Sequence, residues 1–348
     1  MRTSLSYWWN IGSIMGIVLL WQIIRGLFLV LFYTCDAIEA LSSVEYIIRE
    51  VNNGWIVRVS HFNGARLFFL LLYLHMSRGI ILGRFHLWKV WSRGIIILIC
   101  IMGEAFIGYV LPWGQISVWG ACVITRLFSV FPWVGEDLVV WIWGGLVVNR
   151  ATLGCLLILH YLLPFIILII IILHILFLHE LGRTSSCGGR DRELKVKFWP
   201  TFIFKDRVNI IIWSIFLVFI CLWPWFLGDC ENFKEANLIR RPVHIQPEWY
   251  FLFLYAILRA VPNKLGGVLL LALSLFIIWL LCLLPYNWQS NSLKLNTLIL
   301  RILIVLVVVL TLLGCSPVET PLTIISQEFT RCYLILLAAT TLLGWTMW

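Results

Sequence analysis

Four histidines of this 348-residue chain form two pairs with one common spacing. His61 and His75 are 14 residues apart, and so are His160 and His174. Both pairs lie in long apolar segments, where 14 residues advance a helix by just under four turns. The two rings of a pair therefore share one helix face, about 21 Å apart along the axis. Two such helices side by side would place His61 opposite His160 and His75 opposite His174.

This pairing predicts two sites, one above the other, with two imidazoles each. Haem iron is a usual occupant of such a site. A single histidine in an apolar helix can instead be a proton relay or a packed polar group, but the repeated spacing favours ligands. The sequence has no C-x-x-C-H motif for covalent attachment. We therefore expect two non-covalent haems, with four metal ligands: His61, His75, His160 and His174.

Glycines repeat the same step in two further apolar segments. Gly12 and Gly26 are 14 residues apart, and Gly94 and Gly108 are again 14 apart. A flat macrocycle needs close approach from neighbouring helices, which a missing side chain permits. These glycines are therefore expected to lie at the cofactors.

Two arginines flank the first histidine pair. Arg58 precedes His61 by three residues and Arg78 follows His75 by three, so each is one turn nearer to its own membrane face. A guanidinium suits a haem propionate through paired hydrogen bonds. The alternative is that both are interfacial residues whose long side chains reach the membrane surface.

The composition is that of a polytopic membrane protein. The chain is 61% hydrophobic and 12% charged, about half the charged fraction of a soluble domain. Segments long enough to cross a bilayer of about 30 Å cover 9–32, 56–82, 92–112, 151–181, 207–227, 266–286, 297–315 and 327–347. We expect an all-α integral membrane protein with eight transmembrane helices, the first four forming a four-helix di-haem bundle. The expected domains are a di-haem domain, 1–205, and a C-terminal four-helix domain, 206–348.

Basic residues concentrate between the fourth and fifth spans and between the second and third, on the side of the N-terminus. The loop between the first and second spans is acidic. By the positive-inside rule, both termini face the negative compartment. The net charge of +9 thus reflects orientation in the lipid bilayer, and no nucleic-acid partner is expected. No cleavable leader is expected before the first span.

Two connections are apolar without being clean spans. Segment 108–145 is aromatic, amphipathic and interrupted by Pro and Gly, which predicts short helices on the membrane surface. In segment 242–267, Glu248 is an ionisable residue in apolar surroundings and hence a functional candidate. Desolvation would raise its proton affinity, which suits a proton acceptor. The alternative is that Glu248 only caps the following helix.

The segments GYVLPWGQISVWGACVIT (108–125) and PEWYFLFLYAILRAVPNKLGG (247–267), with the doubled histidine spacing, closely resemble cytochrome b of the mitochondrial respiratory complex III. The resemblance implies oxidation of ubiquinol at the positive side, electron transfer through two b-type haems, and reduction of ubiquinone at the negative side, coupled to proton translocation. The implied enzyme is a quinol–cytochrome c oxidoreductase in the mitochondrial inner membrane, with both termini in the matrix. Implied partners are a Rieske iron–sulfur protein, a c-type cytochrome and a second copy of the complex.

The resemblance also implies individual roles. The low-potential haem would be held by His61 and His160, and the high-potential haem by His75 and His174. The quinol-oxidation pocket would use Glu248 as proton acceptor, together with Pro247, Trp249, Tyr250, Tyr109 and Tyr255. The quinone-reduction pocket would use a histidine after the fourth span and an aspartate before the fifth: His179 and Asp206, with Lys205 beside them.

Two residues depart from the pattern of this family. Arg183 stands where many relatives carry a serine near the reduction pocket, which puts direct contact with the quinone there in question. Glu104 lies in the middle of the third span, four residues before Gly108, where relatives have a small or hydroxyl residue. It is either protonated or paired with a partner that the sequence does not reveal. The chain is also shorter at both ends, so an N-terminal surface helix is expected to be missing.

Two rival functions remain open at this point. A secondary transporter could use buried histidines for proton coupling, but it leaves both glycine pairs unexplained. The second rival is a simpler di-haem electron carrier, such as an ascorbate-using membrane cytochrome. That function does not account for the last four spans or for the Pro-Glu-Trp-Tyr segment. A redox spectrum would separate the first rival, and quinol turnover the second.

Overall fold

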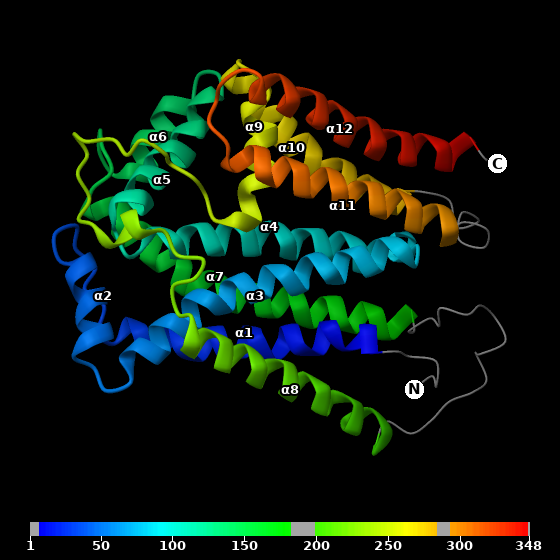
Figure 1. Cartoon of the computed structure of the whole chain (residues 1–348), viewed down its shortest axis with the longest axis horizontal. Coiled ribbons are helices and arrows are strands. Elements are labelled where there is room, and N and C mark those ends of the chain that lie inside the picture. The colour runs from blue at the N-terminus through cyan, green and yellow to red at the C-terminus, as the bar shows by residue number, and fades with distance from the viewer. Residues whose placement is uncertain (1–6, 182–198, 284–292, 347–348) are drawn as a thin grey trace.

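The chain folds into a bundle of long helices lying side by side (Figure 1). This computed structural model describes residues 7–181, 199–283 and 293–346. The long helices are α1 (Asn10–Val30), α3 (Gly54–Ile81), α4 (Trp88–Val110), α7 (Arg150–Leu181), α8 (Thr201–Leu222), α10 (Lys264–Leu280), α11 (Leu293–Cys315) and α12 (Leu322–Thr346). Within these described ranges, 7 helices are long and apolar enough to cross a membrane. The further long helix, α8, has three adjacent charged residues near its start, 205–207. The prediction of an all-α membrane protein is confirmed.

Prolines move two helix boundaries away from the predicted ones. The fifth span, expected at 207–227, is α8, which starts directly after Pro200 and ends before Pro224. Proline fits at the start of a helix but cannot continue one, because it lacks the N–H and clashes with the preceding turn. Asp206 consequently lies inside α8, and its expected position before that helix is wrong. The helix α12 begins after Pro321, five residues before the predicted start at 327.

Short helices cover one end of the bundle. They are α2 (Ala40–Arg49), α5 (Gln115–Thr125) and α6 (Gly135–Trp143), and Figure 1 shows them at the end opposite to the two termini. The helices α5 and α6 confirm the short elements predicted in segment 108–145. The helix α2 was not predicted; it buries Ala40, Ser43 and Ile47, one face of a helix, and it packs against α3.

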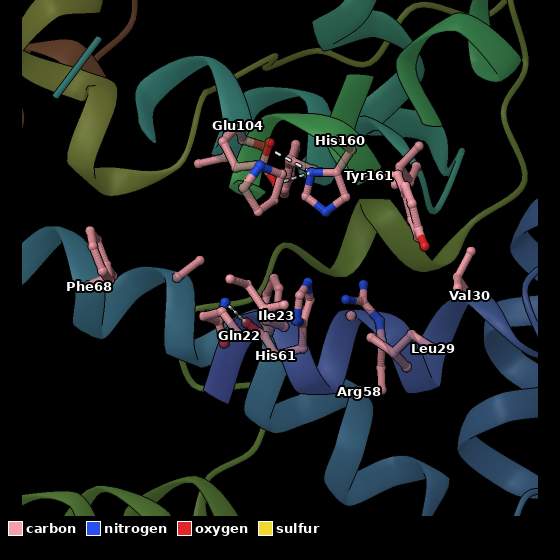
Figure 2. A pocket seen from close by; sticks show the side chains of 18 of the residues that line it. Gln22, Ile23, Leu29, Val30, Arg58, His61, Phe68, Glu104, His160 and Tyr161 are labelled. Atoms are coloured by element: carbon pink, nitrogen blue, oxygen red, sulfur yellow. Dashed lines mark hydrogen bonds and ion pairs between the residues drawn. The ribbon is translucent and has the colours of Figure 1, made fainter. Parts of the chain in front are cut away.

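The first four long helices pack as two pairs. The helix α1 packs along α3, and α4 packs along α7, and these are the most extensive contacts among the four helices. Figure 2 shows the two layers facing each other across a cavity. The C-terminal helices pack around α9 (Leu252–Arg259), with Tyr333 among the buried residues of their cluster. The helix α8 contacts α1 and α3, and the predicted boundary at 205/206 falls inside it; the two-domain division stays a prediction.

Candidate functional site

The structure brings the histidines together in the two pairs that the spacing predicts. The ring centres of His61 and His160 are 6.2 Å apart and their planes are at 89°. Those of His75 and His174 are 6.5 Å apart, at 55°. With metal–nitrogen bonds of about 2 Å, two imidazoles on opposite sides of one metal have ring centres roughly 6 Å apart. Both pairs therefore have the spacing that a bis-imidazole metal centre requires.

Each of the four repeated glycines faces one of these imidazole rings. A Cβ added at the glycine would lie 2.5 Å from the ring atom Cε1 at Gly108–His160, 3.2 Å at Gly26–His61, 3.5 Å at Gly94–His174 and 3.6 Å at Gly12–His75. The first distance is impossible for a real side chain, and the last two are ordinary contacts. The glycines thus make room for the histidine rings directly, most strictly at Gly108.

One histidine differs from the others in its hydrogen bonding. The Nδ1 atoms of His61, His75 and His174 are buried and have no side-chain partner, and the rings of His61 and His174 lie against the backbone of Gln22 and Val90. His160 Nδ1 lies 2.8 Å from Glu104 Oε1 and 3.2 Å from the main-chain oxygen of Glu104. Glu104 thus has the partner that the sequence did not reveal.

A large cavity connects the first histidine pair to the membrane-surface end of the bundle. His61 and His160 face it from opposite layers, and the Arg58 guanidinium points into it (Figure 2). The cavity contains about 1560 Å³ of open space, part of it continuous with solvent. The Nε atom of Arg58 is buried without a hydrogen-bond partner. Such a donor beside two imidazoles suits an anionic group such as a haem propionate.

The second arginine flanking the histidines lies elsewhere. Arg78 donates to the main-chain oxygen of Trp8 at 2.9 Å, and its guanidinium is 5.7 Å from the ring centre of Trp9. It therefore sits at the start of α1, on the side of His75. Its role toward a propionate stays a prediction.

The same cavity is lined by Glu248, Tyr109 and Tyr250. Glu248 is buried with Arg66, their side chains being 7% and 4% exposed. Arg66 donates from Nε to Glu248 Oε2 at 3.0 Å and from Nη2 to Oε1 at 2.9 Å, a two-point ion pair. Glu248 makes no side-chain capping bond to the helical turn η6 (Trp249–Phe251) that follows it. The structure therefore gives the carboxylate an arginine partner in place of a cap.

The sequence analysis missed Arg66. A cation in the middle of an apolar span needs a partner, and that was the available signal. Two further donors of Arg66 go to Asn63 Oδ1 at 3.0 Å and to the Leu227 carbonyl at 2.6 Å. Burial raises the pKa of the Glu248 carboxyl above its ordinary range, while the hydrogen bonds and charge of Arg66 oppose that rise.

Aromatic side chains form the wall next to Glu248. Tyr250 is stacked on Phe69 with ring centres 4.0 Å apart and planes at 4°. Tyr73 fixes the backbone there by donating to the Tyr250 carbonyl at 2.6 Å. Pro247 and Trp249 are half-buried on either side of Glu248. This packing holds the segment as a rigid rim of the cavity.

Tyr255 has a different environment from the other predicted pocket residues. It lies on α9, its hydroxyl donates to the Ile245 carbonyl at 3.4 Å, and Arg259 lies over its ring at 4.4 Å. It is not among the residues lining the cavity. Its role in quinol oxidation stays a prediction.

The predicted reduction-site residues lie at the end of the bundle that holds the termini. Asp206 accepts a hydrogen bond from Ser13 Oγ at 3.4 Å, and Lys205 lies 5.2 Å from the ring centre of Tyr7. His179 is exposed in the last turn of α7, slightly before the expected position after that helix. Arg183 falls outside the described residues. The role of His179, Asp206 and Lys205 in quinone reduction stays a prediction.

Comparison with known proteins settles the family. Residues 1–182 match the family described as Cytochrome b/b6/petB. The chain belongs to the cytochrome b family. Residues 235–334 match the companion family, Cytochrome b(C-terminal)/b6/petD. A solved structure titled "Hyperthermophilic respiratory Complex III" is similar at 28% sequence identity and a TM-score of 0.87, covering 99% of this chain and 94% of that one.

Membership of the cytochrome b family implies b-type haems, and the residues present fit them. The two ring pairs have the required spacing, the glycines leave room for them, and Arg58 offers an unsatisfied donor. The family also argues against the transporter alternative, which needs no haem.

Proposed function

We propose that this chain is the cytochrome b subunit of a respiratory complex III and oxidises quinol at the end of the bundle that carries α2, α5 and α6. The observation that carries the proposal is one cavity lined by His61, His160 and Glu248. It would bring an electron acceptor and a proton acceptor to one place. A b-type haem, when bound, accepts and passes on single electrons.

In this proposal, His61 and His160 hold one haem, and His75 and His174 hold the other. The 14-residue step separates the two sites by about 21 Å along the helices. Arg58 would donate to a propionate of the first haem, and Arg78 to one of the second. The absence of a side chain at the four glycines leaves room for the imidazole rings.

The protein groups around the cavity position and deprotonate the quinol. Tyr250 and Tyr109 provide an apolar wall for a quinone ring. Glu248 takes a proton at a carboxylate oxygen, which requires that oxygen to exchange its hydrogen bond from Arg66 for one from the substrate hydroxyl. Burial raises the pKa of Glu248, which favours acceptance of that proton.

At the opposite end, His179 and Asp206 supply protons for reduction of a second quinone, with Lys205 beside them. The finer assignments that the resemblance implies are part of the same proposal. They are ubiquinone as the substrate, a Rieske protein and a c-type cytochrome as partners, a dimeric complex, and a mitochondrial inner membrane with both termini on the matrix side. The similarity to a solved respiratory complex III supports the assembly.

The test is a reduced-minus-oxidised spectrum combined with quinol turnover. We expect two b-type haem components in the wild type and loss of one in His160→Leu. Glu248→Gln keeps the shape of the side chain and removes the base, and its quinol oxidation should fall about 100-fold at normal haem content. Two unchanged components in the histidine variant would refute the ligand assignment. Full turnover in the glutamine variant would refute the role of Glu248.

A further inference from the structure

Glu104 is a buried carboxylate in the middle of α4. Its side chain is 15% exposed, and Oε1 lies 2.8 Å from His160 Nδ1 (Figure 2). The second oxygen, Oε2, is buried without a hydrogen-bond partner. A carboxylate inside a membrane bundle is strongly destabilising unless it is paired. The contact with His160 is therefore the interaction that offsets the cost of placing Glu104 there.

The direction of this hydrogen bond follows from the role of the ring. If His160 ligates a metal through Nε2, then Nδ1 carries the proton and donates it to the carboxylate. The main-chain oxygen of Glu104, 3.2 Å from Nδ1, is a second acceptor on the same residue. The opposite direction would turn an N–H toward the cavity and prevent ligation. Glu104 thus fixes both the tautomer and the orientation of the ring.

The second histidine pair lacks this carboxylate. The 14-residue step that relates Gly108 to Gly94 on α4 relates Glu104 to Val90. The backbone of Val90 lies beside the ring of His174. Its apolar side chain cannot accept a hydrogen bond. At this position of α4 both sites therefore have a backbone contact to the histidine ring, and only the site of His160 has a buried carboxylate.

We propose that Glu104 is a positioning residue that acts through His160 to lower the reduction potential of the haem held by His61 and His160. A carboxylate that accepts a hydrogen bond from a ligating histidine raises the basicity of that ligand. A more basic ligand, beside a negative charge, stabilises the oxidised metal over the reduced one. The proposal rests on the proposed function, because it requires His160 to be a haem ligand.

The experiment is a redox titration of both haems in membranes that contain the assembled complex. The variants are Glu104→Gln, Glu104→Ala and, as the matched control, Val90→Ala. Glutamine keeps an acceptor oxygen beside Nδ1 and removes the charge. We expect at least a tenfold change in the ratio of oxidised to reduced haem for one component, which is about 59 mV upward for one electron. The other component should stay unchanged, and Val90→Ala should move neither.

The outcomes separate this inference from the proposed function. Wild-type membranes without b-type haem would refute the function itself. Unchanged potentials in both Glu104 variants, with both haems present, would overturn the inference and leave the function intact. Loss of haem from Glu104→Gln would indicate a purely structural role and also overturn it. Loss from Glu104→Ala alone would support the orienting hydrogen bond, and the potential measured in Glu104→Gln then decides the electronic effect.

Discussion

The ion pair between Arg66 and Glu248 gives the sharpest test of quinol oxidation. Arg66→Met removes the guanidinium and keeps a flexible apolar side chain in its place. The variant leaves a carboxylate that is 7% exposed without its arginine. Because both hydrogen bonds from Arg66 stabilise the charged form, their loss should raise the pKa of Glu248 further.

The size of the effect follows from these two bonds. A hydrogen bond to a charged group contributes about 1.5–3 kcal/mol, and one pKa unit corresponds to about 1.4 kcal/mol. Taking the net loss as that of one such bond, the variant should shift the balance toward the neutral carboxyl by roughly 10–100-fold, which raises the pKa of Glu248. Solvent screening reduces this little, because the pair is almost fully buried. A base must be deprotonated to act, so the rise of the rate with pH should move to higher pH.

The assay is quinol-dependent reduction of cytochrome c in membranes, normalised to haem content and measured across pH. On the acid side of the profile, Arg66→Met should be roughly 10–100-fold slower than the wild type, and the two should converge at high pH. The double variant Arg66→Met with Glu248→Gln is the control. It has no titrating carboxyl, so this limb of the profile should disappear.

The reasoning would be refuted if Arg66→Met, at normal haem content, had the same rates as the wild type on the acid side of the pH profile. It would mean that another group accepts the proton. A shift toward lower pH would contradict the sign of the argument, because it would require Arg66 to favour the neutral carboxyl.

Two further predictions concern the glycines and the reduction site. Gly108→Ala places a Cβ 2.5 Å from the ring of His160, and overpacking of this kind costs about 1–3 kcal/mol; spectra should show one haem lost or displaced. In the control Gly103→Ala, on the same helix, no atom lies within 4 Å of the new Cβ, so both haems should be kept. Equal haem loss in the two variants would argue against the need for a glycine beside His160. Asp206→Asn should slow reoxidation of the haem held by His75 and His174 while quinol oxidation stays measurable, and unaffected reoxidation after a pulse of quinol would count against a role in quinone reduction.

The sequence alone determined the helical membrane bundle and the pairing of its histidines. Both follow from period and composition. Apolar runs of bilayer length must form helices in lipid, because backbone groups there have no water to bind. A 14-residue step leaves side chains on one face whatever packs against it. The glycines carried the same step, so the sequence also predicted which helices approach the two sites.

Only the tertiary structure decided the partners of the buried charges. Arg66 and Glu248 are 182 residues apart, and Glu104 and His160 are 56 apart. No periodicity within one helix relates such residues, because their contact depends on how α3, α4, α7 and the segment before α9 pack together. A charge in an apolar segment shows that a partner is required, but the packing selects which residue it is. Here the packing paired Glu248, the proposed proton acceptor, with Arg66, and it placed Glu104 beside only one of the two histidine pairs.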